Sequence, residues 1–164
     1  MKIRSAQPGD SEQLLKLLKQ LDTETRFMLY EPGERTSTSK DMEDIIRQST
    51  LSNSLFLLLE TEGKLAGFLS ASRGKTKRIQ HSAYLVIGIL KDYRGQGYGK
   101  ELFFAMEEWA KESQITRLEL TVMTHNQQAL HLYERMGFQI EGRKERSLIV
   151  DGNSVDEYCM AKLL

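Results

Sequence analysis

The stretch Arg94-Gly95-Gln96-Gly97-Tyr98-Gly99-Lys100 decides the fold of this 164-residue chain. It follows the apolar run 83–90, which has the length of a buried strand, and it precedes the amphipathic segment 101–112, which predicts a helix. Glycines let a backbone come close to a ligand, and the first N–H groups of a helix have no partner within the helix. A strand that turns through glycines into a helix N-terminus is therefore suited to binding an anion such as a phosphate.

Two common glycine motifs do not fit this loop. A P-loop would need Gly at position 94, where Arg94 stands, and Ser or Thr at position 101, where Glu101 stands. A dinucleotide-binding fingerprint that starts at Gly95 would need Gly at position 100. The pattern that fits is Arg/Gln-x-x-Gly-x-Gly/Ala, with Gly97 and Gly99 in the glycine positions. The structural alternative is an ordinary glycine-rich turn that only caps a helix.

A second block, LELTVMTHNQQALHLYERMGF, spans residues 118–138. Apolar and polar residues alternate over 118–123 and predict a half-buried strand. Asn126 is a suitable helix N-cap, and Gly137 ends the predicted helix. The block fits the pattern Asn-x-x-Ala-x-x-Leu-Tyr-x-x-x-Gly-Phe at Asn126, Ala129, Leu132, Tyr133, Gly137 and Phe138.

Together the two blocks resemble the acetyl-coenzyme-A signature of the GNAT superfamily of N-acetyltransferases. The resemblance covers the chain from Ile3 onward and is strongest over 86–141. The segment after residue 141 is similar to bacterial members grouped with ribosomal-protein and small-amine acetyltransferases. The resemblance implies one α/β domain over residues 1–164, with a mixed, mostly antiparallel central sheet. It also implies a βαβ cofactor unit and helices on both faces of the sheet.

Periodicity along the chain predicts the same order of elements. Strands are expected at 2–6, 55–61, 65–72, 83–90, 118–123, 138–141, 147–150 and 155–164, and helices at 11–24, 39–49, 101–112 and 126–136. The almost continuous apolar run 55–61 predicts a strand that is covered on both faces. Ser39 is the expected N-cap of the second helix, with Ile45 facing inward, and Gly88 predicts a bulge or a close backbone approach.

Composition disfavours several classes of protein. Twenty-three basic residues balance 23 acidic ones, so no net charge draws the chain to nucleic acid or to a membrane. The basic run 73–78 is expected to be a solvated hairpin loop. Cys159 is the single cysteine, which excludes an internal disulfide and agrees with a reducing cytoplasm. There is no Cys/His cluster with metal spacing, no apolar run of about 18 residues, and no signal-peptide pattern in the polar N-terminal stretch.

The resemblance implies acetyl-coenzyme A (acetyl-CoA) as the cofactor. The backbone of Ile87, Gly88 and Ile89 would pair with the pantetheine arm like an added strand. Asn126 would contact the cofactor from the second block. The pyrophosphate would be held through the main-chain amides of Arg94, Gly95, Gln96, Gly97, Tyr98, Gly99 and Lys100. Two strands that separate at a bulge would leave free N–H and C=O groups, which an amide-rich arm can satisfy.

The implied reaction is direct attack of an amine on the thioester carbonyl. A primary amine with a pKa of about 10.4 is neutral only about 0.04% of the time at pH 7, which costs about 4.6 kcal/mol, so the site must take up a proton. The amide of Ile89 is the candidate donor to the oxyanion that forms. Tyr133 is the candidate acid for the departing thiolate. From the residues alone, Tyr133 is better explained as a core aromatic, because Ala129, Leu130 and Met136 share its helical face, and it is the resemblance that favours the functional role.

Several groups remain open as the base. Glu119 alternates away from the apolar residues of its strand, toward the side that borders the site. Some relatives carry a glutamate where Thr121 stands, so a base carried over from the family is in doubt. His81 and His125 titrate near neutrality, but a lone histidine is more often a surface or packing residue. Cys159 is expected to be a buried packing residue rather than a nucleophile.

The acceptor pocket is expected between the loops 26–39 and 147–156. Within it, Glu31 is the candidate for binding a cationic amine, together with Glu34. A peptide or protein N-terminus, a polyamine and another small amine all remain possible acceptors, and the family makes a homodimer plausible. A non-catalytic acyl-CoA-sensing or partner-binding module is the alternative, but such a module would not need an acid like Tyr133. The lack of acidic metal ligands disfavours a kinase or NTPase.

Overall fold

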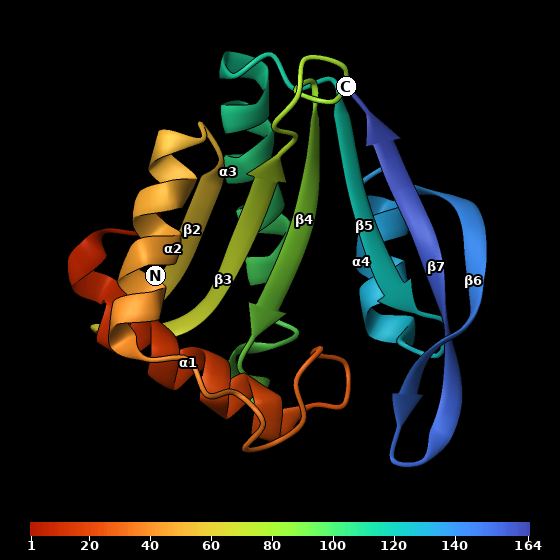
Figure 1. Ribbon diagram of the computed structural model, residues 1–164, viewed down its shortest axis with the longest axis horizontal. Coiled ribbons are helices and arrows are strands. Elements are labelled where there is room, and N and C mark those ends of the chain that lie inside the picture. The colour runs from red at the N-terminus through yellow and green to blue at the C-terminus, as the bar shows by residue number, and fades with distance from the viewer.

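The computed structural model describes residues 1–164 and has the mixed α/β fold expected from the sequence (Figure 1). One sheet contains all the strands, in the order β1-β2-β3-β4-β5-β7-β6. Only β4 and β5 pair in parallel, and every other neighbouring pair is antiparallel. The strands are β1 Lys2–Ser5, β2 Leu55–Thr61, β3 Lys64–Arg73, β4 Ser82–Ile89, β5 Arg117–Met123, β6 Gln139–Val150 and β7 Asn153–Leu163.

Helices cover both faces of this sheet (Figure 1). The helices α1 (Ser11–Glu24) and α2 (Ser39–Leu51) lie over one face, and α3 (Tyr98–Glu112) and α4 (Gln127–Arg135) lie over the other. Two 3-10 turns, η1 (Pro8–Asp10) and η2 (Lys91–Tyr93), precede α1 and α3. The unit β4-α3-β5 is the expected βαβ unit. None of the helices combines the length and the apolar composition that a membrane-spanning segment requires.

Each face of the sheet has its own hydrophobic cluster, and β2 contributes to both. Leu57 and Leu59 pack in the cluster beneath α3 and α4, whereas Leu58 packs in the cluster beneath α1 and α2. Leu58 and Leu59 have no exposed surface. Burying each such side chain contributes about 1.5–3 kcal/mol, so the continuous apolar run is explained by a strand covered on both sides.

The second helix differs from its prediction at both ends. Thr38, not Ser39, is the N-cap: its Oγ1 accepts a hydrogen bond from the N–H of Asp41 at 3.2 Å, and the Asp41 carboxylate accepts from the N–H of Thr38 at 2.7 Å. This reciprocal capping box stabilises the first turn. The helix continues to Leu51, and Ile45 is 46% exposed because only one narrow stripe of α2 faces the sheet.

The strand β6 is one long element rather than the two short strands that were predicted. Its register with β7 shifts at two places, between Ile140 and Gly142 and between Lys144 and Leu148. Most of its side chains are exposed because β6 is the edge of the sheet. The polar stretch between the two predicted strands gave no strand signal, since an edge strand without a covered face carries no apolar alternation.

Gly88 does not mark a bulge. The register between β3 and β4 is unbroken from Gly67↔Ile89 to Arg73↔Ala83. A Cβ atom at Gly88 would lie 2.9 Å from Leu21 Cδ1 and 2.9 Å from Phe68 Cε1. A side chain at position 88 would clash with these atoms, so glycine is needed here because α1 packs directly on β4.

Candidate functional site

The parallel strands β4 and β5 separate, and the opening between them is the centre of the candidate site (Figure 1). They pair only from Ser82↔Arg117 to Tyr84↔Glu119, although both strands continue beyond these residues. The separation expected from the sequence is present, but it arises where the β4–β5 ladder stops and not at a bulge.

The hydrogen-bond pattern of β4 identifies the groups that face this opening. Gly74 N–H donates to the Ser82 carbonyl at 2.9 Å and Leu90 N–H donates to the Ala66 carbonyl at 2.9 Å, so even-numbered residues of β4 bond to β3. Because direction alternates along an antiparallel pair, Ile87 and Ile89 direct their N–H and C=O groups away from β3, toward the opening. The backbone of Gly88 points to β3, so of the three predicted residues it is the one whose main chain does not face the opening.

The glycine loop presents a row of free N–H groups. Gly97 is the N-cap of α3 with φ +85°, a conformation that favours glycine, and the first helical hydrogen bond runs from Glu101 N–H to the Gly97 carbonyl at 3.3 Å. None of the N–H groups of residues 95–100 donates a hydrogen bond within the protein. The positive end of the α3 dipole adds to their attraction for an anion. This main chain fits a diphosphate group.

The side chains of the loop brace it. Arg94 Nε donates to the Ile89 carbonyl at 2.8 Å and thereby ties the loop to the end of β4. The amide of Gln96 donates to the Asp92 carbonyl at 3.0 Å. A Cβ at Gly99 would lie 2.9 Å from Leu132 Cδ2, so Gly99 lets α3 pack against α4. Tyr98 is half-buried against the core, and Lys100 Nζ lies 5.2 Å from the centroid of the Phe104 ring.

Tyr133 lies on α4 with its ring in the core. Its ring centroid is 5.9 Å from that of Phe103 and 6.1 Å from that of Phe138. Burial raises the pKa of Tyr133, and the nearby Tyr84 raises it further. The hydroxyl makes no hydrogen bond within the protein and stays protonated near pH 7. The ring is therefore a core aromatic, as one interpretation of the sequence held, while its polar end remains free to donate.

Asn126 caps α4, as predicted. Its Oδ1 accepts a hydrogen bond from the N–H of Ala129 at 3.3 Å. The amide nitrogen of the same side chain has no partner in the protein, and Asn126 is only partly buried. The residue thus fills its structural role and keeps donors available for a ligand.

A groove of about 240 Å³ lies between the segment after α1 and the β6–β7 hairpin. These are the two loops in which the acceptor pocket was expected. Arg26 Nε pairs with Asp151 at 2.9 Å, and the rings of Phe27 and His125 lie 5.2 Å apart. The loop after α1 therefore reaches both the hairpin and the β5–α4 connection. The groove is lined by Thr25, Arg26, Met28, Leu29, Tyr30, Glu31, Pro32, Met123, Leu148, Ile149, Val150 and Asp151.

Glu31 lies in the wall of this groove, as expected. Its main-chain N–H donates to Glu34 Oε2 at 2.8 Å, so Glu34 shapes the loop, and the carboxylate of Glu31 has no partner. A larger groove of about 650 Å³ lies between β1 and the outer side of α3. Its lining contains no residue of β5 or of the two acceptor loops, whereas Met123 of β5 and residues of both loops line the smaller groove, so the smaller groove is the candidate acceptor site.

The side chains considered as the general base either pair with other groups or lie away from the opening between β4 and β5. Arg117 Nε donates to Glu119 at 2.6 Å, and Arg117 also pairs with Glu141. The hydrogen bonds that Arg117 donates to these two carboxylates, the one to Glu141 first, raise the pKa of Arg117, and the charge of Glu119 is thus already paired. The Thr121 hydroxyl lies 2.6 Å from the Tyr84 hydroxyl.

The other groups considered from the sequence are no better placed. The main chain of His81 bonds to Thr116 at the far end of β4, away from the opening. The ring of His125 packs on Phe27. Cys159 is half-buried, not fully buried as expected, and lies opposite Thr121 on the acceptor side of the sheet. No group of three or more His, Cys, Asp or Glu side chains that could hold a metal ion is present.

Sequence reasoning missed the ion pair that anchors the acceptor loop. Arg35 donates to both oxygens of Asp22, at 2.8 and 3.0 Å, and Asp22 is 1% exposed. The guanidinium also lies 4.3 Å from the centroid of the Tyr30 ring. The signal was a carboxylate at position 22, next to Leu21 on the apolar face of the predicted helix, where a charge needs a partner.

Comparisons with known proteins find matches in both sequence and fold. A family model described as "Acetyltransferase (GNAT) family" matches residues 16–138. An acetyltransferase of the GNAT family from Streptococcus pneumoniae has 37% sequence identity, a TM-score of 0.95, and coverage of 99% of this chain and 98% of that chain. A putative acetyltransferase from Salmonella typhimurium, solved with its cofactor acetyl-CoA, shares the fold with a TM-score of 0.89 at 16% identity, over 100% of this chain and 94% of that one.

Among curated proteins, a putative [ribosomal protein bS18]-alanine N-acetyltransferase from Bacillus subtilis is 32% identical over 116 residues. The match covers 70% of this chain and 74% of the relative. Matches to two further curated N-acetyltransferases span 39% and 64% of the length of those proteins.

Proposed function

Because the chain belongs to the acetyltransferase (GNAT) family, we propose that it moves an acetyl group from acetyl-CoA to a primary amine. One observation carries this proposal. The edge of β4 at Ile87 and Ile89, where only the Ile89 carbonyl is occupied, leads directly into the free N–H groups of residues 95–100. An amide-rich arm that ends in a diphosphate is a ligand that satisfies both sets of groups at once.

When bound, acetyl-CoA supplies a thioester whose carbonyl carbon an amine can attack. The N–H of Ile89 points into the opening and is proposed to donate to the carbonyl oxygen as it gains negative charge. Arg94 occupies the carbonyl of the same residue and holds this stretch of main chain in place. Asn126 is proposed to contact the ligand through its free amide nitrogen.

Tyr133 is proposed to donate a hydrogen bond to the sulfur as it leaves. Full proton transfer from an ordinary tyrosine, pKa about 10, to a thiolate, pKa about 8.5, is unfavourable by about 2 kcal/mol. Burial raises the pKa of Tyr133 and increases this cost. The hydroxyl therefore stabilises the thiolate by hydrogen bonding, while the proton that yields the free thiol comes from elsewhere. This refines the sequence-based assignment of Tyr133 as a proton donor.

The proposed acceptor is a cationic amine that enters the groove beside Glu31. The groove has an apolar lining with one unpaired carboxylate, which suits an ammonium group carried on a partly apolar body. A peptide or protein N-terminus fits this description, and the name of the Bacillus subtilis relative points the same way. A polyamine or another small amine also fits.

We further propose that residues 1–164 act as one domain, in the cytoplasm, as a homodimer without nucleic acid or membrane as a partner. The single free cysteine suits a reducing compartment, and the balanced charge gives no general attraction for polyanions. The exposed edge strand β6 suits pairing with a second copy.

Two measurements test the central proposal. Calorimetric titration with coenzyme A is expected to show saturable binding, and acetyl-CoA with a panel of peptides, polyamines and small amines is expected to release free thiol. Absence of coenzyme A binding would overturn the proposal. Binding without thiol release from any amine would instead favour the acyl-CoA-sensing module.

A further inference from the structure

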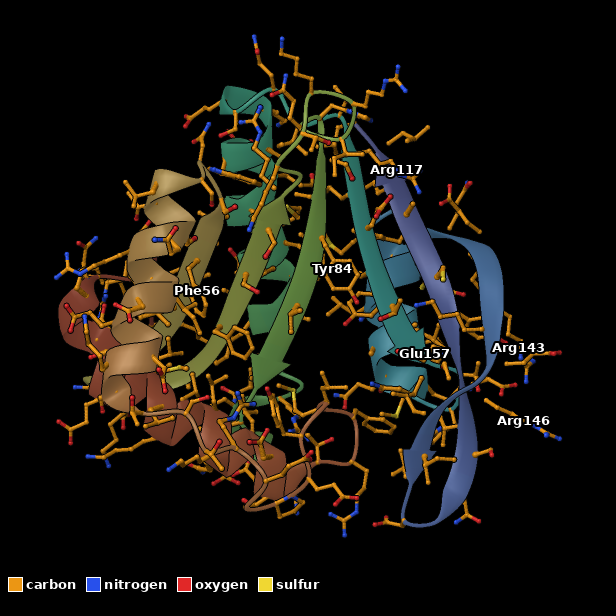
Figure 2. All side chains as sticks on the ribbon, viewed as in Figure 1. Phe56, Tyr84, Arg117, Arg143, Arg146 and Glu157 are labelled. Carbon is orange, nitrogen blue, oxygen red and sulfur yellow. The ribbon has the colours of Figure 1, made fainter.

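The acceptor side of the sheet carries a carboxylate that has no role so far. Glu157 on β7 lies directly opposite Met123 of β5, and Met123 lines the acceptor groove. Paired residues on neighbouring strands point to the same face, so the Glu157 side chain shares the face of Met123. In Figure 2, Glu157 lies beside the C-terminal end of β5, and Tyr84 lies between β4 and β5.

Glu157 is held in place but not neutralised. The Ser147 hydroxyl donates to Glu157 Oε1 at 2.9 Å, and Oε2 has no hydrogen-bond partner. Lys144 stands opposite in the β6 register without forming an ion pair with it. Glu157 is half-buried, and the thiol of Cys159 lies next along the same face of β7.

Most other carboxylates around the opening and the hairpin have cationic partners, and Glu145 of β6, which has none, is exposed. Glu119 and Glu141 pair with Arg117, Asp151 pairs with Arg26, and Asp156 pairs with Arg143. Glu31 is unpaired, but it lies on the exposed loop at the outer wall of the groove. Among these, Glu157 is the unpaired carboxylate that is half-buried and held by a hydrogen bond on a strand, and such a fixed position is what precise contact with a reacting group requires.

We propose that Glu157 receives the ammonium group of the acceptor and takes its proton before the amine attacks. This assignment rests on the proposed acetyltransferase function and completes its proton balance. The ammonium loses one proton to the Glu157 carboxylate, which passes it to solvent. The nitrogen then forms a bond to the acetyl carbon as the carbon–sulfur bond breaks. The second proton leaves the nitrogen for solvent, and the sulfur departs as a thiolate that is hydrogen-bonded to Tyr133 and is later protonated. The sum is RNH3⁺ plus acetyl-CoA giving RNH–acetyl, free coenzyme A thiol and one H⁺.

The variant Glu157→Gln tests the assignment because it keeps the shape and the Ser147 contact but removes the base. A positioned base contributes about 10²- to 10⁴-fold, so kcat/KM for an aliphatic amine is expected to fall at least about 100-fold. The Kd for coenzyme A should not change. With hydroxylamine, which is already neutral at pH 7, the loss should be at least about tenfold smaller. Glu145→Gln, an exposed carboxylate on β6, is the matched control and should behave like wild type.

The outcomes separate the two proposals. Wild-type kcat/KM in Glu157→Gln overturns the role of Glu157, and so does an equal loss with the aliphatic amine and hydroxylamine. Weakened coenzyme A binding in this variant also overturns it, because the effect would then be structural. A wild-type protein that binds coenzyme A yet acetylates nothing in the panel overturns the acetyltransferase proposal itself.

Discussion

Tyr133 shows how one side chain serves both the core and the site. Its ring packs against Phe103 and Phe138, while its hydroxyl has no partner within the protein. No buried side-chain nitrogen or oxygen of the protein lacks a hydrogen-bond partner, so the unpaired Tyr133 hydroxyl must be reached by solvent. A ligand can reach the same donor, which is consistent with the proposed contact with the leaving sulfur.

Tyr133→Phe separates these roles because it keeps the ring and removes the hydroxyl. A hydrogen bond to a charged group contributes about 1.5–3 kcal/mol, so kcat is expected to fall about 10- to 100-fold. Initial rates of thiol release measure the fall, and calorimetry should show unchanged affinity for coenzyme A. Tyr93→Phe, at a partly buried tyrosine of η2, is the control. Unchanged turnover in Tyr133→Phe would remove the assignment.

A substitution at Gly97 tests whether the free N–H groups of residues 95–100 form a backbone cradle that binds coenzyme A, because it changes a single backbone angle of this loop. At φ +85° a β-branched residue is strained by about 1–3 kcal/mol, and relief of this strain would turn the neighbouring N–H groups away from the ligand. We expect Gly97→Val to weaken coenzyme A binding at least about tenfold in calorimetry. Gly9→Ala, where a Cβ meets open space, should bind normally. Equal affinity in the two variants would argue against a backbone cradle.

At the scale of elements, the loop after α1 is fixed by a pair of charges that its own helix helps to supply. Asp22 of α1 holds Arg35 of the loop, and Arg35 in turn covers Tyr30. Both charged side chains are largely buried, with 1% and 10% of their surface exposed. The position of the acceptor wall is therefore linked to α1 and, through α1, to the core.

Asp22→Asn is expected to destabilise the protein by about 3–5 kcal/mol, because it leaves the buried Arg35 without its counter-charge. The loop should also lose its position, so KM for the amine should rise more than the Kd for coenzyme A. Denaturant unfolding and steady-state kinetics measure the two effects. Glu12→Gln, which removes an exposed ion pair with Lys16, should cost no more than about 0.5 kcal/mol. If the two variants had equal stability, the anchor would have no energetic role.

The elements that the sequence predicted well are those whose signal is local. The helix over Ser11–Glu24 and the strand over Leu55–Thr61 have the predicted bounds, since apolar periodicity and cap residues determine them within a few turns. The errors at β6 and Gly88 concern long-range pairing. Whether a strand has a neighbour, and which helix presses on a glycine, depends on residues far away in the chain.

The candidate site divides in the same way. The glycine loop and the two acceptor loops carried sequence patterns, and the structure places the first at the end of β4 and the others along the groove. Tyr133 carried a pattern too, and it lies near Tyr84 of β4. The pairing of Glu119 with Arg117 and of Asp22 with Arg35 carried no pattern that names the partner. Glu157 became visible only through its register with Met123, which no local spacing encodes.

At the scale of the whole molecule, the two edges of the sheet are unequal. The strand β1 is 4 residues long, whereas β6 is 12 residues long and most of its side chains are exposed. A long edge with free backbone groups invites pairing with another chain unless it is covered. The proposed homodimer would cover it.

Light scattering is expected to give a mass near twice the 18.9 kDa of one chain. Ile140→Glu, at a 48% exposed position of β6, should shift the protein toward the monomer by placing like charges across the shared edge. Leu51→Glu, at a 77% exposed position of α2, should not. A monomeric wild type would contradict the proposed dimer, but it would not affect the proposed acetyl transfer.

The short pairing between β4 and β5 makes this the weakest connection between neighbouring parts of the sheet. Three residue pairs are all that join the two parts of the sheet directly. A ligand bound between the two strands would supply hydrogen bonds that the strands do not make with each other. The protein would therefore resist proteolysis and mechanical unfolding best in its ligand-bound form. When a cell contains little acetyl-CoA, more of the protein would then be without ligand and open to proteolysis. The lifetime of the protein would therefore depend on the supply of acetyl-CoA.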